Sequence, residues 1–94
     1  MTLPMTACEW RVGEFDPHRS HEEIRIVERG QRDGTILYAV TQRGWTANHD
    51  REWEREPIPS SRDDEYIARC RFTEWEEAAR VAQHLATYGG PRRA

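Results

Sequence analysis

The sequence contains no lysine, only two cysteines and few aliphatic residues. Cys8 and Cys70 lie far apart and belong to no CxxC motif, which argues against the disulfide framework of small secreted proteins. Residues 1–7 lack a basic segment followed by an apolar run, so no signal peptide is expected, and no window approaches the length of a membrane span. We therefore expect a cytoplasmic protein with two reduced thiols.

Leu, Ile, Val and Phe together make up only 14 of the 94 residues, a low fraction for a folded domain. Four tryptophans and three tyrosines supply large apolar side chains instead, and a net charge of −3 is too small to keep the chain expanded. We expect one domain over residues 1–94 with a small, aromatic-rich core and loose ends at residues 1–7 and 91–94.

All 14 basic residues are arginines, and they are interleaved with the acidic ones along the chain. This usage either reflects the base composition of a GC-rich genome or serves the bidentate recognition of carboxylate or phosphate, which lysine does not provide. The net negative charge argues against unspecific binding to nucleic acid, whereas a local arginine patch is compatible with it.

Residues 53–72 separate a strand-rich first half from a helical second half. Pro57 and Pro59 prevent a helix or a central strand from passing through this segment. Ser61, followed by a run of acidic residues, predicts a helix over residues 61–70, with Ser61 as N-cap. An alternation that a strand would also show runs through Tyr66, Ala68, Cys70 and Phe72, so strand is the alternative interpretation.

Alternating apolar residues predict strands at residues 9–15, 22–29, 35–42 and 51–56, with a short apolar segment at 45–47. The strand at 35–42 is apolar on both faces and is therefore expected to be central. In the strand at 51–56, Trp53 should face the core and its four charged neighbours the solvent, which protects an edge strand. The glycines of residues 30–34 indicate a hairpin loop, and residues 48–50 a polar turn.

The strongest helix is predicted over residues 73–88. Thr73 and Glu76 form a capping-box pattern, and Gly89 and Gly90 mark the end. Its apolar stripe consists of Trp75, Ala78, Ala79, Ala82 and Leu85, with Val81 and Tyr88 near its borders. The expected fold is α+β: a small antiparallel sheet of three to four strands, one long C-terminal helix packed on one face, and a short preceding helix.

The sequence lacks the common phosphate-binding, nucleophile-elbow and zinc-protease motifs. Its four histidines and two cysteines show no metal-ligand spacing. Cys70 lies between Arg69 and Arg71, which could activate a thiol, but a core cysteine is the preferred interpretation. We predict no catalytic residue, no metal site and no cofactor.

Binding to another protein is the predicted function, because tryptophan and arginine dominate binding hot spots. The alternative for Trp45 and Trp53 is a purely structural role in the core. An acidic row at Glu52, Glu54 and Glu56 could compete for a nucleic-acid channel of the partner. The predicted protein-binding residues are Trp45, His49, Arg51, Glu52, Trp53, Glu54, Arg55 and Glu56.

A small nucleic-acid-binding regulator is the second hypothesis, with phosphate contacts at Arg62, Arg69, Arg71 and Arg80. A homodimer is compatible with either hypothesis, because the core is short.

Residues 52–65, followed by Arg69-Cys70-Arg71-Phe72, resemble short proteins of phages and mobile elements in GC-rich bacteria. These proteins have no agreed activity, so no residue role carries over. The resemblance implies a small, acidic, non-enzymatic accessory protein whose partner is a host protein or nucleoprotein complex, as for anti-CRISPR and other anti-defence inhibitors.

Overall fold

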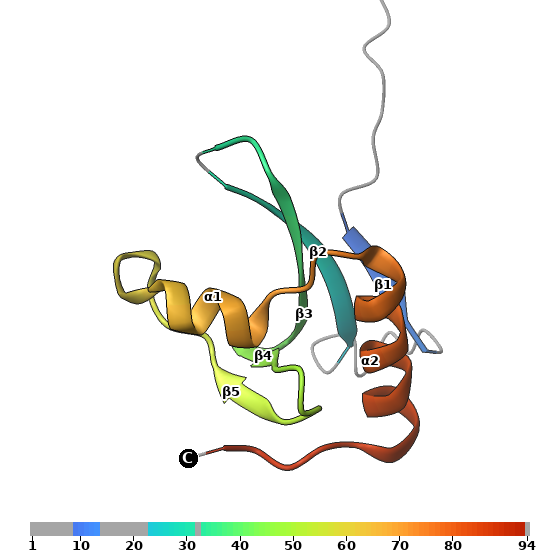
Figure 1. Ribbon diagram of the computed structural model, residues 1–94. Helices are drawn as coiled ribbons and strands as arrows, with labels where there is room; N and C mark the ends of the chain where they lie inside the picture. The colour runs from blue at the N-terminus through green and yellow to red at the C-terminus, as the bar shows by residue number, and fades with distance from the viewer. Residues whose placement is uncertain (1–8, 14–22, 32, 94) are drawn as a thin grey trace, which may run out of the picture.

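The computed structural model describes residues 9–13, 23–31 and 33–93; the predicted loose leader at residues 1–7 lies outside them. The described residues form one sheet and two α-helices, and the fold is α+β as predicted. In chain order (Figure 1), the elements are β1 (Glu9–Val12), β2 (Ile24–Gly30), β3 (Ile36–Gln42), β4 (Trp45–Ala47), β5 (Trp53–Arg55), the 3-10 helix η2 (Pro59–Ser61), α1 (Asp64–Cys70) and α2 (Trp75–Tyr88).

The sheet has five strands in the order β1-β2-β3-β4-β5, and every neighbouring pair is antiparallel. The predicted three to four strands are therefore too few. The short segment at β4 is a full member of the sheet, because it pairs with β3 through Thr41 and Thr46 and with β5 through Ala47 and Trp53. As predicted, β3 lies in the middle of the sheet.

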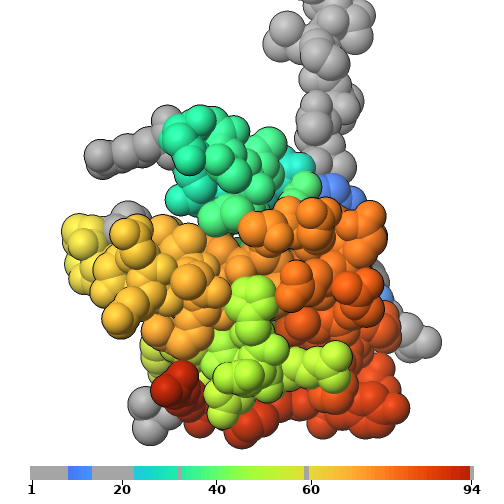
Figure 2. Space-filling view, in the orientation of Figure 1, coloured from blue at the N-terminus to red at the C-terminus, as the bar shows by residue number. Residues whose placement is uncertain are grey.

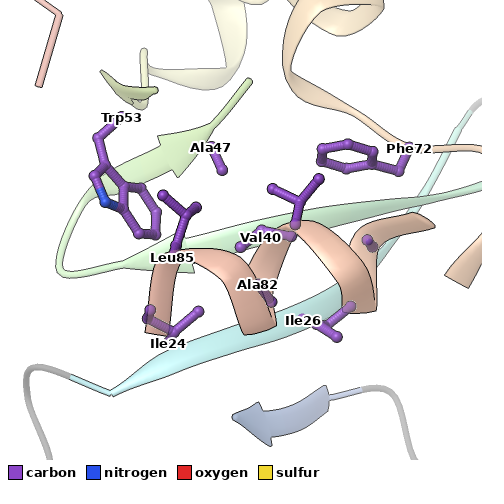
Figure 3. Close-up of a cluster of buried hydrophobic side chains, with 10 residues drawn as sticks. Ile24, Ile26, Val40, Ala47, Trp53, Phe72, Ala82 and Leu85 are labelled. Carbon is purple, nitrogen blue, oxygen red and sulfur yellow. The ribbon is translucent and has the colours of Figure 1, made fainter. Parts of the chain in front are cut away.

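Helix α2 covers one face of the sheet, with most of its contacts to β2 and β3. Figure 3 shows side chains from the two layers meeting in the core, with Leu85 of α2 close to Trp53 of β5. Trp53 is only 4% exposed, so the structural role is correct for this tryptophan. Burying one such large apolar side chain stabilises the fold by roughly 1.5–3 kcal/mol. The core cluster consists of Ile24, Ile26, Val40, Ala47, Trp53, Phe72, Ala78, Val81, Ala82 and Leu85.

The segment after β5 forms a helix, as predicted, but α1 begins later than expected. The predicted N-cap Ser61 lies in the 3-10 turn η2, and the actual N-cap is Asp63, whose carboxylate accepts a hydrogen bond from the Tyr66 N–H at 2.9 Å. Of the residues whose alternation also suggested a strand, only Phe72 pairs as a strand residue would. It lies just beyond the end of α1 and exchanges two backbone hydrogen bonds of 2.8 Å with Tyr38 of β3.

Helix α2 also begins later than predicted. Its N-cap is Glu74, whose side chain makes no capping hydrogen bond, so Thr73 and Glu76 do not form the expected capping box. The apolar stripe is shifted as well: Val81 is buried, whereas Trp75 is 36% exposed. The helix ends at Tyr88, before the two glycines.

Residues 91–93 pair with β5 and do not form the expected frayed end, while Ala94 lies outside the described residues. The Trp53 N–H donates to the Pro91 carbonyl at 2.8 Å, and the Arg93 N–H donates to the Trp53 carbonyl at 2.7 Å. The chain reaches this position because Gly90 has no Cβ: an added Cβ would lie 2.5 Å from both the Arg51 carbonyl oxygen and a methyl carbon of Leu85. The outer side of β5 is thus occupied.

Candidate protein-binding surface

The predicted turn at residues 48–50 is organised by Asn48, which is fully buried. Its Oδ1 accepts hydrogen bonds from the N–H groups of Asp50 at 3.0 Å and Glu52 at 2.9 Å. Its Nδ2 donates to Glu52 Oε1 at 3.1 Å and to Glu54 Oε2 at 2.9 Å. Both acceptor and both donor positions of the amide are used, which a buried polar side chain requires. The pattern of an Asn in a turn predicted the local bend but not this burial.

His49 connects the turn to the helices. Its Nε2 lies 2.8 Å from the Arg71 carbonyl oxygen and its Nδ1 lies 3.2 Å from Glu77 Oε1. The ring packs against Phe72, with centroids 4.4 Å apart. In the space-filling view of Figure 2, this turn lies between α1 and α2. His49 therefore has a structural role in addition to its partial exposure.

Arg51 is exposed at the end of the same turn, with a positive φ of 63°. Its guanidinium lies 3.1 Å from Nδ1 of His84 on α2. This predicted contact residue thus also ties the turn to α2.

The predicted acidic row does not form an exposed surface. Glu54 is only 9% exposed, so the expectation that the charged neighbours of Trp53 face water is wrong for this residue. The Arg69 Nε donates to both Glu54 oxygens, at 3.0 and 2.9 Å. Burial alone would raise the pKa of the Glu54 carboxyl, but hydrogen bonds from Arg69 and Asn48 outweigh it and hold the pKa below its usual range.

Arg71 is the most deeply buried of the arginines proposed for phosphate contact, with 3% of its side chain exposed. Its NH2 donates to Glu56 Oε1 at 3.0 Å. Its NH1 lies 3.1 Å from the Cys70 carbonyl oxygen, 3.3 Å from the Tyr66 hydroxyl and 3.4 Å from the Thr46 hydroxyl. These contacts make Arg71 a structural residue.

Arg62 is held by the same carboxylate as Arg71: its NH2 is 3.5 Å from Glu56, and its Nε donates to the Pro57 carbonyl at 3.0 Å. Arg80 is exposed on α2 and takes part in no ion pair of the described residues. The structure thus places five residues of the two predicted sites in two ion-pair groups: Glu54 pairs with Arg69 and also lies near Arg93, whereas Glu56 pairs with Arg62 and Arg71.

Cys70 lies at the centre of this region and is fully buried. Burial, together with the negative charge of Glu54, raises the pKa of its thiol to about 12. The neighbouring Arg69 and Arg71 do not lower it enough, because their guanidinium groups are engaged with carboxylates. Within residues 9–13, 23–31 and 33–93, no three His, Cys, Asp or Glu side chains are grouped to hold a metal ion.

Trp45 presents a different surface, since it is only half-buried. The Arg55 guanidinium lies over its ring at 4.3 Å from the centroid, and the Arg92 guanidinium lies at 5.0 Å. Arg92 was not among the predicted site residues, because its segment was expected to be frayed. The pairing of that segment with β5 brings it to Trp45.

A cleft of about 420 Å³ adjoins this surface and is lined by Glu54, Arg55, Arg69 and Arg93. Arg93 lies with its NH1 3.6 Å from Glu54 Oε2 and keeps 54% of its side chain exposed. We define the arginine cluster as Arg55, Arg69, Arg92 and Arg93. With Glu54 it carries a formal charge of +3 in a chain whose net charge is −3.

Comparison of the chain with protein-family models, with curated proteins and with solved structures finds no match. In the part of the chain that the structure describes, no helix has the length and apolar character needed to cross a membrane.

Proposed function

We propose that the protein is a non-enzymatic binding protein that attaches to another protein through Trp45 and the arginine cluster. One observation carries the proposal: the half-buried Trp45 indole has two guanidinium groups over it, at 4.3 and 5.0 Å. Tryptophan and arginine are the residue types that dominate binding hot spots. Stacking on the indole also orients the arginines before a partner arrives, which lowers the entropic cost of association.

The proposed surface differs from the surface expected from sequence. Trp53 belongs to the core, Glu54 is paired with Arg69, and Glu56 is paired with Arg71. An acidic row that imitates nucleic acid is therefore not part of the proposal. Of the predicted residues, Trp45, Arg55 and Arg69 belong to the surface, and the C-terminal segment adds Arg92 and Arg93. In the form that the sequence resemblance implies, the partner is a bacterial host nucleoprotein complex, and binding inhibits it.

The proposal is tested by affinity capture from a bacterial lysate with tagged wild-type protein and an Arg55→Ala/Arg92→Ala variant. Both arginines are exposed, so this variant should keep its fold, which circular dichroism checks. The matched control is Arg80→Ala, another exposed arginine. We expect a partner that wild type and control retain and the double variant loses.

Identical captured proteins for all three chains, or none for any, would contradict the proposal. If only the protein itself is recovered, light scattering decides whether it forms a homodimer.

A further inference from the structure

We infer that the cleft at the arginine cluster is a carboxylate-binding site that takes an acidic segment of a partner protein. This inference rests on the proposed function and names the chemistry that the partner supplies. It begins from the three arginines that line one cleft of about 420 Å³, a volume within the range of about 300–1,000 Å³ seen for small-ligand pockets.

Only one of these three arginines, Arg69, donates a hydrogen bond to a carboxylate of the protein itself. The Arg69 Nε donates to both oxygens of Glu54. Arg93 approaches the same carboxylate only to 3.6 Å, and Arg55 makes no ion pair with any described residue. The guanidinium groups of Arg55 and Arg93 therefore have donors available for a guest anion.

Both available arginines are positioned in advance. Arg55 is held over the Trp45 ring, and the backbone of Arg93 is fixed by its hydrogen bond of 2.7 Å to the Trp53 carbonyl. Two guanidinium groups that are held in place in this way can bind one planar carboxylate together. Their charge-assisted hydrogen bonds are roughly twice as strong as neutral ones. In one wall of the cleft, Arg69 already binds a carboxylate, because its Nε donates to both oxygens of Glu54.

The charge distribution favours a short acidic peptide over nucleic acid. The arginine cluster with Glu54 carries +3, so the remaining residues carry −6 to reach the net −3 of the chain. A long polyanion would extend beyond the cluster and meet this acidic remainder, because electrostatic repulsion acts over a Debye length of about 8–10 Å. A segment with one or two Asp or Glu residues contacts the cluster alone.

The neighbouring arginines do not extend the cluster into a continuous surface that could bind successive phosphates of a nucleic acid. Arg62 and Arg71 are tied to Glu56. The Trp45 indole, on which a base would stack, already carries two guanidinium groups.

The test uses the purified full chain and a fluorescein-labelled diglutamate peptide, a hexapeptide in which two adjacent glutamates stand among four glycines. Binding is followed by fluorescence anisotropy at about 20 mM and about 300 mM salt. The variant is Arg55→Gln/Arg93→Gln, and the matched control, Arg80→Gln/Arg51→Gln, removes the same charge outside the cleft. We expect the cleft variant to bind the peptide at least about tenfold more weakly than wild type and the control to stay within about threefold of wild type. Arginine Nε–H signals of Arg55 and Arg93 should shift in NMR spectra on addition of the peptide.

Three results would overturn the carboxylate site: equal weakening in the two double variants, equal binding of the same labelled peptide with glutamines in place of its two glutamates, or no binding at all. Tighter binding of a ten-thymidine oligonucleotide to the same arginines would also overturn it and indicate nucleic acid instead. Failure of the proposed function is a separate result. If the lysate partner still depends on Arg55 and Arg92 while the diglutamate peptide does not bind, only the carboxylate site is overturned. If the diglutamate peptide binds the cleft and no partner is captured, the proposed function fails.

Discussion

Asn48 donates a hydrogen bond of 2.9 Å to Glu54, and this bond connects the turn between β4 and β5 to the arginine cluster. The same Glu54 carboxylate accepts from Arg69 and lines the cleft beside Arg55 and Arg93. The geometry of the surface therefore depends on a fully buried amide. Only a side chain with two donors and an acceptor of this length can satisfy the turn and the carboxylate together.

Replacing Asn48→Asp should destabilise the fold strongly. The new carboxylate cannot donate to Glu52 or Glu54, and it places a second negative charge beside them in a buried site. We expect a loss of about 3 kcal/mol or more in the free energy of unfolding, measured by urea denaturation. The control is Asp50→Asn, which changes one charge in an exposed position of the same turn and should alter stability by less than about 0.5 kcal/mol. Equal stability of the two variants would show that the Asn48 amide does not hold the turn.

The pKa of Glu54 predicts a specific response to acid. Its carboxyl has a lower pKa in the folded state than the ordinary value of 4.5, so the folded protein binds this proton less readily than the unfolded chain does. The stabilisation is fully present above pH 4.5 and is lost as the pH falls below it towards the folded-state pKa. In Glu54→Gln, the fall in unfolding free energy on acidification should be shallower than in wild type, although the variant is less stable at neutral pH.

Urea midpoints measured across this pH range test that prediction. Glu74→Gln is the control, because Glu74 is exposed and its side chain makes no capping hydrogen bond. Parallel acid profiles for Glu54→Gln and wild type would contradict the assigned role of Glu54.

The order of strands and helices could be predicted from sequence because it depends on local patterns. The periodicity of α2 and the prolines before α1 act within a few residues, and both helices are present. The starts of the helices were placed too early. Ser61 and Asp63 are equally good caps in isolation, and Thr73 is a better cap than Glu74, whose side chain makes no capping hydrogen bond. Which residue becomes the cap depends on where the preceding chain is anchored.

The site was harder to predict because its contacts join distant segments. Trp53 was correctly expected to face the core. Glu54 points to the other face of β5, where it is covered by Arg69, fifteen residues after Glu54 in the chain. Nothing in the alternation of β5 indicates that Glu54 will be buried there. Arg92 and Arg93 were missed for the same reason, since their position depends on the pairing of the C-terminal segment with Trp53.

Removing the Arg71 guanidinium should be costly for the fold. Arg71→Met leaves the partly buried Glu56 carboxylate, 14% exposed, without its closest partner and should lower the free energy of unfolding by about 2–3 kcal/mol. The double variant Arg71→Met/Glu56→Gln removes the unpaired charge and should recover part of this loss. Chemical denaturation of the single and double variants measures the coupling, with Arg80→Met as the exposed control. Additive losses, or a stability of Arg71→Met close to that of the control, would argue that Arg71 and Glu56 are not coupled.

The turn between β3 and β4 contains a strained arginine whose replacement should stabilise the protein. Arg43 and Gly44 have φ values of +48° and +81° between the paired residues Gln42 and Trp45, which is the geometry of a two-residue type I′ hairpin. Glycine adopts this conformation freely and asparagine tolerates it, whereas arginine does so at a cost. Arg43→Asn should therefore raise the free energy of unfolding by about 0.5–1 kcal/mol, and Gly44→Ala should lower it by more than about 1 kcal/mol.

Arg43→Lys separates backbone strain from charge in this test, because it keeps both the positive charge and the unfavourable φ. Its stability should match wild type within about 0.5 kcal/mol. If Arg43→Asn gains no stability while Gly44→Ala costs nothing, the hairpin does not require two positive φ angles. The sharp turn that reverses the chain between β3 and β4 would then need another explanation.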